Sequence, residues 1–344
     1  MMTWDELDYA RLETLRARFL ERTAGEADYW TDDADLAAYD LTFAERIGWK
    51  WDAVLRELAL RQWQAPRHVP VVDWGCGSGI ALRRWLQHMG FEGWSQLIVS
   101  DRSARAMRFA EERLRARYAT VSLPQPEIRQ LSPEAAASAV TGGVLLVSHV
   151  LNELDATGRA RLLDVAAQAQ AVVWVEPGSY DESRALIQLR EALMQDFRPI
   201  APCTHAAGCG MLTEENNRHW CHHFGRAPVE AFTEGHWARF GQWLGIDLRS
   251  LPYSFLVLER RTREESAEPG PGWSRVIGHA REYKGYLKLL NCQAEGVEEL
   301  MMQKRDAKAL HKHLRKEKYF PLYRWRRTVD KVIGGEAMDT DGLL

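Results

Sequence analysis

The chain has 344 residues, a formal net charge of -3 and five cysteines. This length is sufficient to bury a full hydrophobic core, and it predicts two unequal units. The low, odd cysteine count excludes a disulfide scaffold and favours a reducing compartment. Because the overall charge is nearly balanced, any basic binding surface must be local.

The beginning of the chain, MMTWDELDYARLE, is acidic and lacks an apolar core. It therefore predicts neither a secretory signal nor an Arg-rich transit peptide. The longest apolar runs, such as VLLV and AVVWV, are too short to cross a bilayer. We expect a soluble, cytoplasmic protein with no membrane partner and no DNA partner.

Apolar residues recur at three- and four-residue spacing near the N-terminus, which predicts a helical region over residues 1–64. Over residues 65–260, nearly all-apolar segments alternate with helical ones, which is typical of a parallel sheet covered on both faces. The predicted strands are residues 69–74, 96–101, 142–150, 171–178 and 253–261, and the predicted helices are residues 79–90, 103–119, 158–170 and 181–197. The expected class is therefore α/β, with a doubly wound sheet.

After residue 260 the sequence no longer alternates between apolar and helical segments. Residues 261–272 include TREESAEPGPG, whose charge and Pro/Gly content predict a linker. The segments WSRVIGHARE and GYLKLLNC then predict a small hairpin, followed by a basic helical tail, within residues 273–331. Residues 332–344 are expected to be disordered.

A glycine loop, VVDWGCGSG, joins a predicted buried strand to a predicted helix, where doubly wound sheets bind nucleotides. Gly75, Gly77 and Gly79 alternate, so that the backbone can turn tightly and approach a ligand. In a dinucleotide fingerprint the third glycine would fall at Ile80, which excludes that class of site. The pattern instead resembles the first motif of class I S-adenosylmethionine-dependent methyltransferases.

This resemblance implies a Rossmann-like methyltransferase fold in which the glycine loop passes under the methionine end of S-adenosylmethionine. Asp73 would orient the loop or meet the amino group of the cofactor through water. Asp101, at the end of the second predicted strand, would accept hydrogen bonds from both ribose hydroxyls. The alternatives are a purely structural turn for the glycines and a helix cap for Asp101.

Catalytic residues are not identified by the sequence. Amino-group methyltransferases usually carry an Asn/Asp-Pro-Pro-aromatic signature after the fourth strand, and here the segment reads VSHVLNEL. His149, Asn152 and Glu153 could face a substrate, or they could cap and orient the following helix. Cys76, inside the glycine loop, is expected to be a small packing residue.

A cysteine-rich insertion, residues 200–226, contains Cys203, Cys209 and Cys221 with gaps of five and eleven residues. These gaps differ from the short knuckles of zinc fingers, but widely spaced thiolates can surround an iron–sulfur cluster. Cys292 is the only cysteine left for a fourth ligand. A Cys₃His zinc site that uses one of the nearby histidines (His205, His219, His222 or His223) and a set of merely buried thiols are the alternatives.

Six segments occur in an order that resembles the small-ribosomal-subunit-associated, methyltransferase-like family: LNELDATGRARLLD, VWVEPGS, APCTHAAGC, WCHHFGRAP, YSFLVLERR and GYLKLLNC. Members are found in bacteria and as assembly factors of the mitochondrial ribosome. The resemblance covers about residue 35 to about residue 327. It implies a class I methyltransferase fold with a small C-terminal extension. It also implies a [4Fe-4S] site whose ligands fall on Cys203, Cys209, Cys221 and Cys292.

Residues 304–331 hold eleven basic and three acidic residues, a local charge of +8. The aromatic residues Tyr319, Phe320, Tyr323 and Trp325 interleave with the cations. This combination favours rRNA as a partner, through phosphate contacts and base stacking, whereas the plainer interpretation is a solvated helix face. The expected function is an S-adenosylmethionine-binding, iron–sulfur protein that acts on the small ribosomal subunit or its rRNA, as an assembly factor or as an rRNA methyltransferase. The alternative is a small-molecule or protein methyltransferase with structural zinc.

Overall fold

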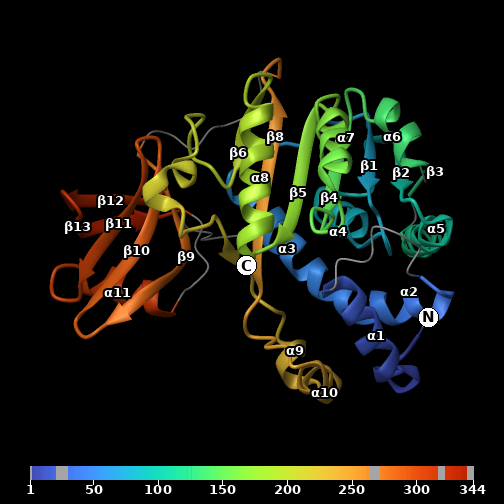
Figure 1. Cartoon of the computed structure of the whole chain (residues 1–344), viewed down its shortest axis with the longest axis horizontal. Helices are drawn as coiled ribbons and strands as arrows, with labels where there is room; N and C mark the ends of the chain where they lie inside the picture. Colours follow the sequence, from blue (N-terminus) through green and yellow to red (C-terminus); the bar gives the residue numbers. More distant parts are fainter. Residues whose placement is uncertain are drawn as a thin grey trace. The chain divides into compact units, whose positions relative to one another are not determined.

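The computed structural model describes residues 2–20, 30–121, 123–124, 126–263, 272–316 and 322–338 (Figure 1). The chain divides into two compact units. The first unit comprises Met1–Leu55, Ala65–Glu176 and Arg226–Leu251; the second comprises Arg56–Gln64, Pro177–Gly225 and Pro252–Leu344.

The first unit contains parallel strands in the order β3-β2-β1-β4-β5. The strands are β1 (Val69–Trp74), β2 (Trp94–Ser100), β3 (Glu127–Leu131), β4 (Val144–Ser148) and β5 (Ala171–Pro177). The helices between them are α4 (Ile80–Met89), α5 (Ala104–Tyr118), α6 (Pro133–Ala139) and α7 (Ala156–Ala166). The predicted α/β class with a parallel-sheet core is confirmed. The strand β3 was not predicted, because this edge strand, EIRQL, buries a single residue and has no apolar run.

The N-terminal residues of the first unit form helices that pack against a distant part of the chain. These elements are η1 (Trp4–Glu6), α1 (Tyr9–Leu20), α2 (Asp33–Tyr39), the π-helix η3 (Asp40–Ala44) and α3 (Glu45–Leu60), which continues into the second unit. Their apolar faces share one core with α9 (Glu230–Thr233) and α10 (Gly235–Leu244), in which Leu12, Leu36 and Phe240 are all fully buried. Burial of this core fixes the helices beside the sheet.

After Arg56–Gln64, the second unit continues with α8 (Tyr180–Leu193) and a small antiparallel group in which β8 pairs with β6 and with β7. The remaining elements of this part are β6 (Phe197–Ala201), η4 (Gly210–Leu212), η5 (Glu214–Asn216), β7 (His223–Phe224) and β8 (Pro252–Arg260). The cysteine-rich segment, residues 200–226, runs from the end of β6 through η4 and η5 to β7.

The C-terminal region is a closed five-stranded barrel, of which the predicted hairpin is one part. The prediction of a basic helical tail holds for Lys308–Lys316 and is wrong for Leu322–Thr328, which form a strand. The barrel consists of β9 (Ser274–Tyr283), β10 (Tyr286–Gln293), β11 (Gly296–Gln303), β12 (Leu322–Thr328) and β13 (Lys331–Ala337), with α11 (Lys308–Lys316) inserted after β11. Alternate residues, such as Leu287 and Leu289 or Leu300 and Met302, fill its core. The interleaved cations obscured this two-residue period in the sequence.

Two expectations about the ends of this region fall partly outside the described residues. Within the predicted disordered end, residues 332–337 belong to β13, so disorder is wrong there, and residues 339–344 lie outside the described residues. Residues 264–271 of the predicted linker lie outside them as well. None of the described helices combines the length and the apolar character that a membrane crossing requires.

Candidate functional site

The glycine loop follows β1 in the first unit, at the carboxyl end of the parallel strands. Gly75 and Gly77 have φ angles of 69° and 51°, in the left-handed region that favours glycine. A Cβ on Gly75 would lie 2.7 Å from Cγ1 of Val150, whereas a Cβ on Gly77 would meet nothing within 4 Å. Gly75 is therefore required for close packing against the loop after β4, and Gly77 borders open space beside the loop.

Asp73 lies at the end of β1 and is fully buried. Its Oδ2 accepts a hydrogen bond from the backbone N–H of Leu82 in α4 (3.3 Å), so the carboxyl group orients the loop-to-helix turn. Its Oδ1 has no hydrogen-bond partner among the described residues. Burial, with a smaller contribution from the nearby Asp101 charge, raises the pKa of Asp73 to about 8.

Asp101 follows β2 directly and closes the other side of the glycine loop. Its Oδ2 accepts a hydrogen bond from the backbone N–H of Gly77 (3.0 Å), and its Oδ1 accepts one from that of Ser103 (2.9 Å). The carboxylate thus holds the loop. Because the four lone-pair sites of a carboxylate exceed these two bonds, it can also accept hydroxyl donors.

Lys50 and His149 form a pair near the same strand ends. Nζ of Lys50 lies 3.0 Å from Nε2 of His149, and His149 has a φ of 55°, a strained conformation for a non-glycine residue. Burial lowers the pKa of Lys50 to about 7, and burial together with the Lys50 charge lowers the pKa of His149 well below its usual value. Near neutral pH a fraction of the Lys50 amine is therefore uncharged and able to accept a proton.

The N-terminal helices also supply Tyr39 and Asp40, which the sequence analysis did not single out. Asp40 is bound by Arg83 of α4 and by Arg113 of α5 (2.8 Å), which anchors the π-helix η3. Burial raises the pKa of Tyr39, and the charges of Glu153, Asp40 and Asp101 add to the effect, so its phenol stays protonated near the site. Nothing in the local sequence distinguishes these residues, because only the packing of the helices brings them to the strand ends.

The other candidates after β4 have separate roles. The helix α7 is capped by Asp155, whose side chain accepts from the N–H of Gly158 (2.7 Å), so neither Asn152 nor Glu153 is the cap. Oδ1 of Asn152 has no hydrogen-bond partner among the described residues. Burial raises the pKa of Cys76 well above its usual value, and the adjacent Asp101 and Asp73 charges raise it further, so this thiol is not an activated nucleophile.

These features fit the methionine end of S-adenosylmethionine. An orphaned buried carboxyl oxygen is costly unless a ligand pairs with it, and Oδ1 of Asp73 is such an atom. The open side of Gly77 leaves room for a ligand, and Asp101 is bound to the backbone N–H of the same glycine. Asp73, Gly75, Gly77, Gly79 and Asp101 would hold the cofactor here.

The second unit brings the four remaining cysteines into one neighbourhood. Cys203, Cys209 and Cys221 line a cavity of ≈ 30 Å³ beside α8. Cys292, on β10 of the barrel, packs in the same cluster as Cys209 and Cys221. The fold therefore brings together thiols that are up to 89 positions apart in the sequence.

Burial and the closeness of the other cysteines both raise the pKa values of these thiols. Burial and the neighbouring Cys203 charge raise the pKa of Cys209 to about 11, and burial and the other cysteines raise the pKa values of Cys221 and Cys292 further. Arg190 and Arg275 oppose this shift for Cys292. A group of thiolates in this place therefore needs a cationic partner.

Two of the four candidate histidines approach the thiols. Nε2 of His205 lies 3.6 Å from Sγ of Cys292, and Nε2 of His223 lies 3.7 Å from Sγ of Cys221. His219 and His222 instead contact Arg218 and the carbonyl of Trp220. Within the described ranges, no three Cys, His, Asp or Glu side chains are arranged to hold a metal ion.

Buried polar residues hold the backbone of the cysteine-rich segment. Arg61 donates to the carbonyls of Ile200 (2.8 Å), Pro202 (2.8 Å) and Cys203 (3.0 Å), and Ser183 and Ser254 each donate to the carbonyl of Cys221 (2.7 Å). Arg190 donates to the carbonyls of His205 (3.3 Å) and Ala207 (2.8 Å). These anchors were not predicted, because they lie on three separate elements, α8, β8 and the turn after α3, which only the folded chain brings to the segment.

Among the described basic residues of 304–331, Lys304 and Arg305 lie in the turn after β11, and the others lie on α11 and on the strands β12 and β13. Tyr323 is fully buried, and Trp325 stacks on it at 4.6 Å and donates to Oδ1 of Asn291 (2.8 Å). The expectation that Tyr323 is available to stack on a base is therefore wrong, since it belongs to the barrel core, whereas Trp325 is partly buried and packs against that core. Tyr319 and Phe320 lie outside the described residues.

Comparison with solved structures gives matches of low similarity. A plantazolicin methyltransferase, BpumL, in complex with SAH has 12% identity and a TM-score of 0.39 over 73% of this chain and 100% of that chain. The related BamL has 10% identity and a TM-score of 0.41 over 72% of this chain and 98% of that chain. A proposed RNA methyltransferase from Pyrococcus horikoshii has 10% identity and a TM-score of 0.36 over 60% of this chain and 81% of that chain.

No curated protein sequence matches this chain significantly. A family profile does match: the family described as mitochondrial small ribosomal subunit Rsm22 aligns with residues 34–323. This range covers most of both units, including the glycine loop, the cysteine-rich segment and most of the barrel. The chain therefore belongs to the Rsm22 family.

Proposed function

We propose that this protein binds S-adenosylmethionine in the first unit and acts on the small ribosomal subunit or its rRNA. The observation that carries the cofactor assignment is the buried, unpaired Oδ1 of Asp73 beside the open face of Gly77. The ribosomal partner is supported by the family, whose description names the mitochondrial small ribosomal subunit. The proposed compartment of this chain remains the cytoplasm.

S-adenosylmethionine supplies an electrophilic methyl group. In this proposal Asp73 orients the loop and meets the amino group of the cofactor through water, and Asp101 accepts hydrogen bonds from its ribose hydroxyls. Lys50, held by His149, can accept a proton at Nζ, so the same site has a base available for methyl transfer.

The second part of the proposal is a [4Fe-4S] cluster on Cys203, Cys209, Cys221 and Cys292. It is supported by the convergence of these residues and by Arg190 and Arg275, which offset the negative charge of a thiolate-bound cluster. The competing proposal is a Cys₃His zinc site, because His205 and His223 each lie close to one of the thiols.

Three measurements on the full chain test the proposal. Calorimetry should detect S-adenosylmethionine binding, and sedimentation should show association with purified small subunits. After anaerobic purification, a brown protein with about four irons per chain supports the cluster. A colourless protein with stoichiometric zinc contradicts it, and a chain that binds neither the cofactor nor the subunit contradicts the function.

A further inference from the structure

The C-terminal barrel has a specific strand order. Its sequence of neighbours is β9-β10-β11-β13-β12, closing on β9, and every pair is antiparallel except β11 with β13. The helix α11 lies between the third and fourth strands. This is the topology of the OB-fold, a Greek-key barrel that binds oligonucleotides with its second and third strands and with the loops between strands 1–2 and 4–5.

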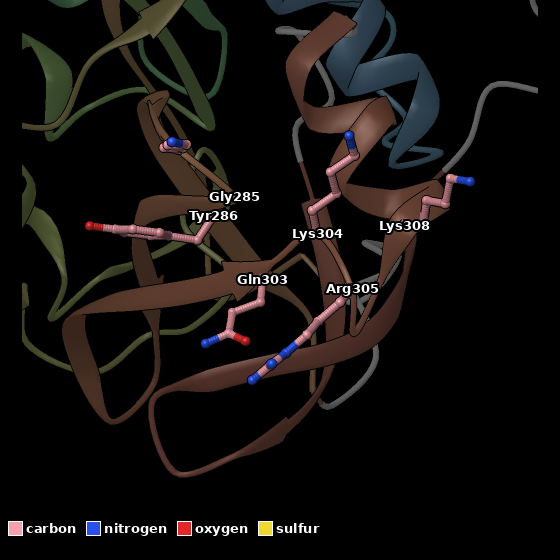
Figure 2. A pocket seen from close by; sticks show the side chains of 7 residues that line it. Gly285, Tyr286, Gln303, Lys304, Arg305 and Lys308 are labelled. Atoms are coloured by element: carbon pink, nitrogen blue, oxygen red, sulfur yellow. The ribbon is translucent and has the colours of Figure 1, made fainter.

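An open pocket of ≈ 600 Å³ lies at one end of this barrel (Figure 2). Its lining comes from the β9–β10 turn, the start of β10, the end of β11 and the start of α11: Lys284, Gly285, Tyr286, Gln303, Lys304, Arg305 and Lys308. The N–H of Lys304 donates to the carbonyl of Gly285 (2.9 Å), and the N–H of Met301 donates to that of Asp330 (2.9 Å). Both loops of the OB-fold binding face therefore meet the end of β11.

The charge of this pocket is available for a ligand. Lys284, Lys304 and Lys308 are exposed, and none forms an ion pair with a described residue. On β12, by contrast, Arg324 pairs with Glu336 (2.8 Å) and Arg327 pairs with Glu298. An anion approaching the three lysines does not have to break an ion pair with a described residue, whereas one approaching Arg324 or Arg327 does.

A pair of aromatic rings lies next to the lysines. Tyr283 and Tyr286, on either side of the β9–β10 turn, are stacked in parallel with 4.9 Å between ring centroids, and Tyr283 is 42% exposed. Bases stack on such rings in single-stranded nucleic-acid complexes, while lysines contact the backbone phosphates. A duplex, whose bases are already stacked and paired, does not offer them to these rings.

We propose that the pocket formed by the β9–β10 turn, the end of β11 and the start of α11 binds single-stranded RNA. Lys284, Lys304 and Lys308 contact phosphates, and the exposed face of Tyr283 stacks on a base. This inference rests on the ribosomal RNA partner of the proposed function and assigns the surface that contacts it.

The test uses the full chain and a fluorescent single-stranded RNA of about 12 nucleotides, within the range of OB-fold sites. The combined Lys284→Ala, Lys304→Ala and Lys308→Ala variant should bind about 100-fold more weakly at 0.1 M salt, with a salt slope reduced by about 2, because each lost phosphate contact contributes about 0.7. The matched control, Arg324→Ala, Arg326→Ala and Arg327→Ala, removes the same charge from β12 and should lose much less affinity.

The aromatic contact has its own readout. Tyr283→Ala should lower affinity about 10-fold without changing the salt slope, and Tyr283→Phe should retain wild-type affinity because it keeps the ring. The assignment of RNA binding to this pocket is overturned if the lysine variant and the wild type bind the RNA with equal affinity. It is also overturned if the β12 control loses more affinity than the lysine variant. Small-subunit binding without any binding of this RNA also overturns it and leaves the proposed function standing.

Discussion

Asp73 is the residue whose chemistry depends most on the fold around it. It is fully buried, one of its oxygens orients α4, and the other has no partner among the described residues. Burial therefore favours the neutral form, and the pKa of about 8 lies above the unfolded value of 3.8. Between these values the folded state holds more protons than the unfolded state.

This difference predicts that the Asp73 contribution to stability is present at low pH and is lost as the pH rises toward 8. The Asp73→Asn variant keeps a neutral side chain at every pH. Its free energy of unfolding should therefore fall less than that of the wild type between pH 6 and pH 8, by at most about 1.4 kcal/mol per pH unit. Urea titrations at the two pH values measure this, and parallel changes in both proteins contradict it.

Asp101 tests the cofactor site directly. Replacement of Asp101 by Ala removes a charged acceptor and the hydrogen bond to Gly77, so the free energy of S-adenosylmethionine binding should weaken by about 1.5–3 kcal/mol. Gly77→Val should weaken binding by another route, because it places a branched side chain at a positive φ beside the ligand. Calorimetry compares both with Glu112→Ala, an exposed carboxyl change on α5, and unchanged affinity in both variants contradicts the site.

Among the secondary-structure elements, α3 and α8 decide where the cysteine-rich segment lies. From α3 and the turn after it, Glu57 and Arg61 are both buried, and Glu57 also pairs with buried Arg275 on β9. From α8, Ser183 and Arg190 bind carbonyls of the segment. The segment has little regular structure of its own, and these side chains replace the missing backbone hydrogen bonds.

Arg61→Met should therefore disturb more than one contact. It leaves three carbonyls without their donor and leaves Glu57 with Arg275 alone, so unfolding should cost about 3–5 kcal/mol less than in the wild type. Denaturant titration of the full chain measures the loss, together with the iron content of the purified protein. Arg56→Met, an exposed change on the same helix, should alter neither quantity, and a stable Arg61→Met protein would contradict the anchoring role.

Across the second unit, Cys292 connects the barrel with the cysteine-rich segment. It lies on β10 and packs with Cys209, Cys221 and Met211, so the barrel already touches the segment through apolar contacts. A cluster bound by all four cysteines would add covalent links to this packing. RNA binding by the barrel would then depend on the cluster.

This dependence predicts that cluster-free protein and the Cys292→Ser variant bind rRNA more weakly than the iron-loaded chain. The reason is that, without the cluster, the barrel that carries the proposed RNA pocket loses its link through Cys292 to the cysteine-rich segment. Anisotropy titrations across a range of salt concentrations measure affinity and slope for the three forms. Cys76→Ser, at the cysteine of the glycine loop, serves as the control, and equal affinity in all three forms would rule the dependence out.

The sequence was sufficient for the parallel α/β core, the glycine loop and the candidate cysteines, because these depend on short-range patterns. A buried strand is a continuous apolar run, and a glycine loop needs its glycines at neighbouring positions. The barrel was not predicted, since its apolar residues alternate with cations and its strands pair only after the chain closes on itself. Lys50, Tyr39 and Arg61 were not predicted either, because burial and long-range packing give them their roles. Periodicity and spacing are local properties of a chain, whereas pKa shifts, buried ion pairs and the convergence of distant thiols exist only once the chain is folded.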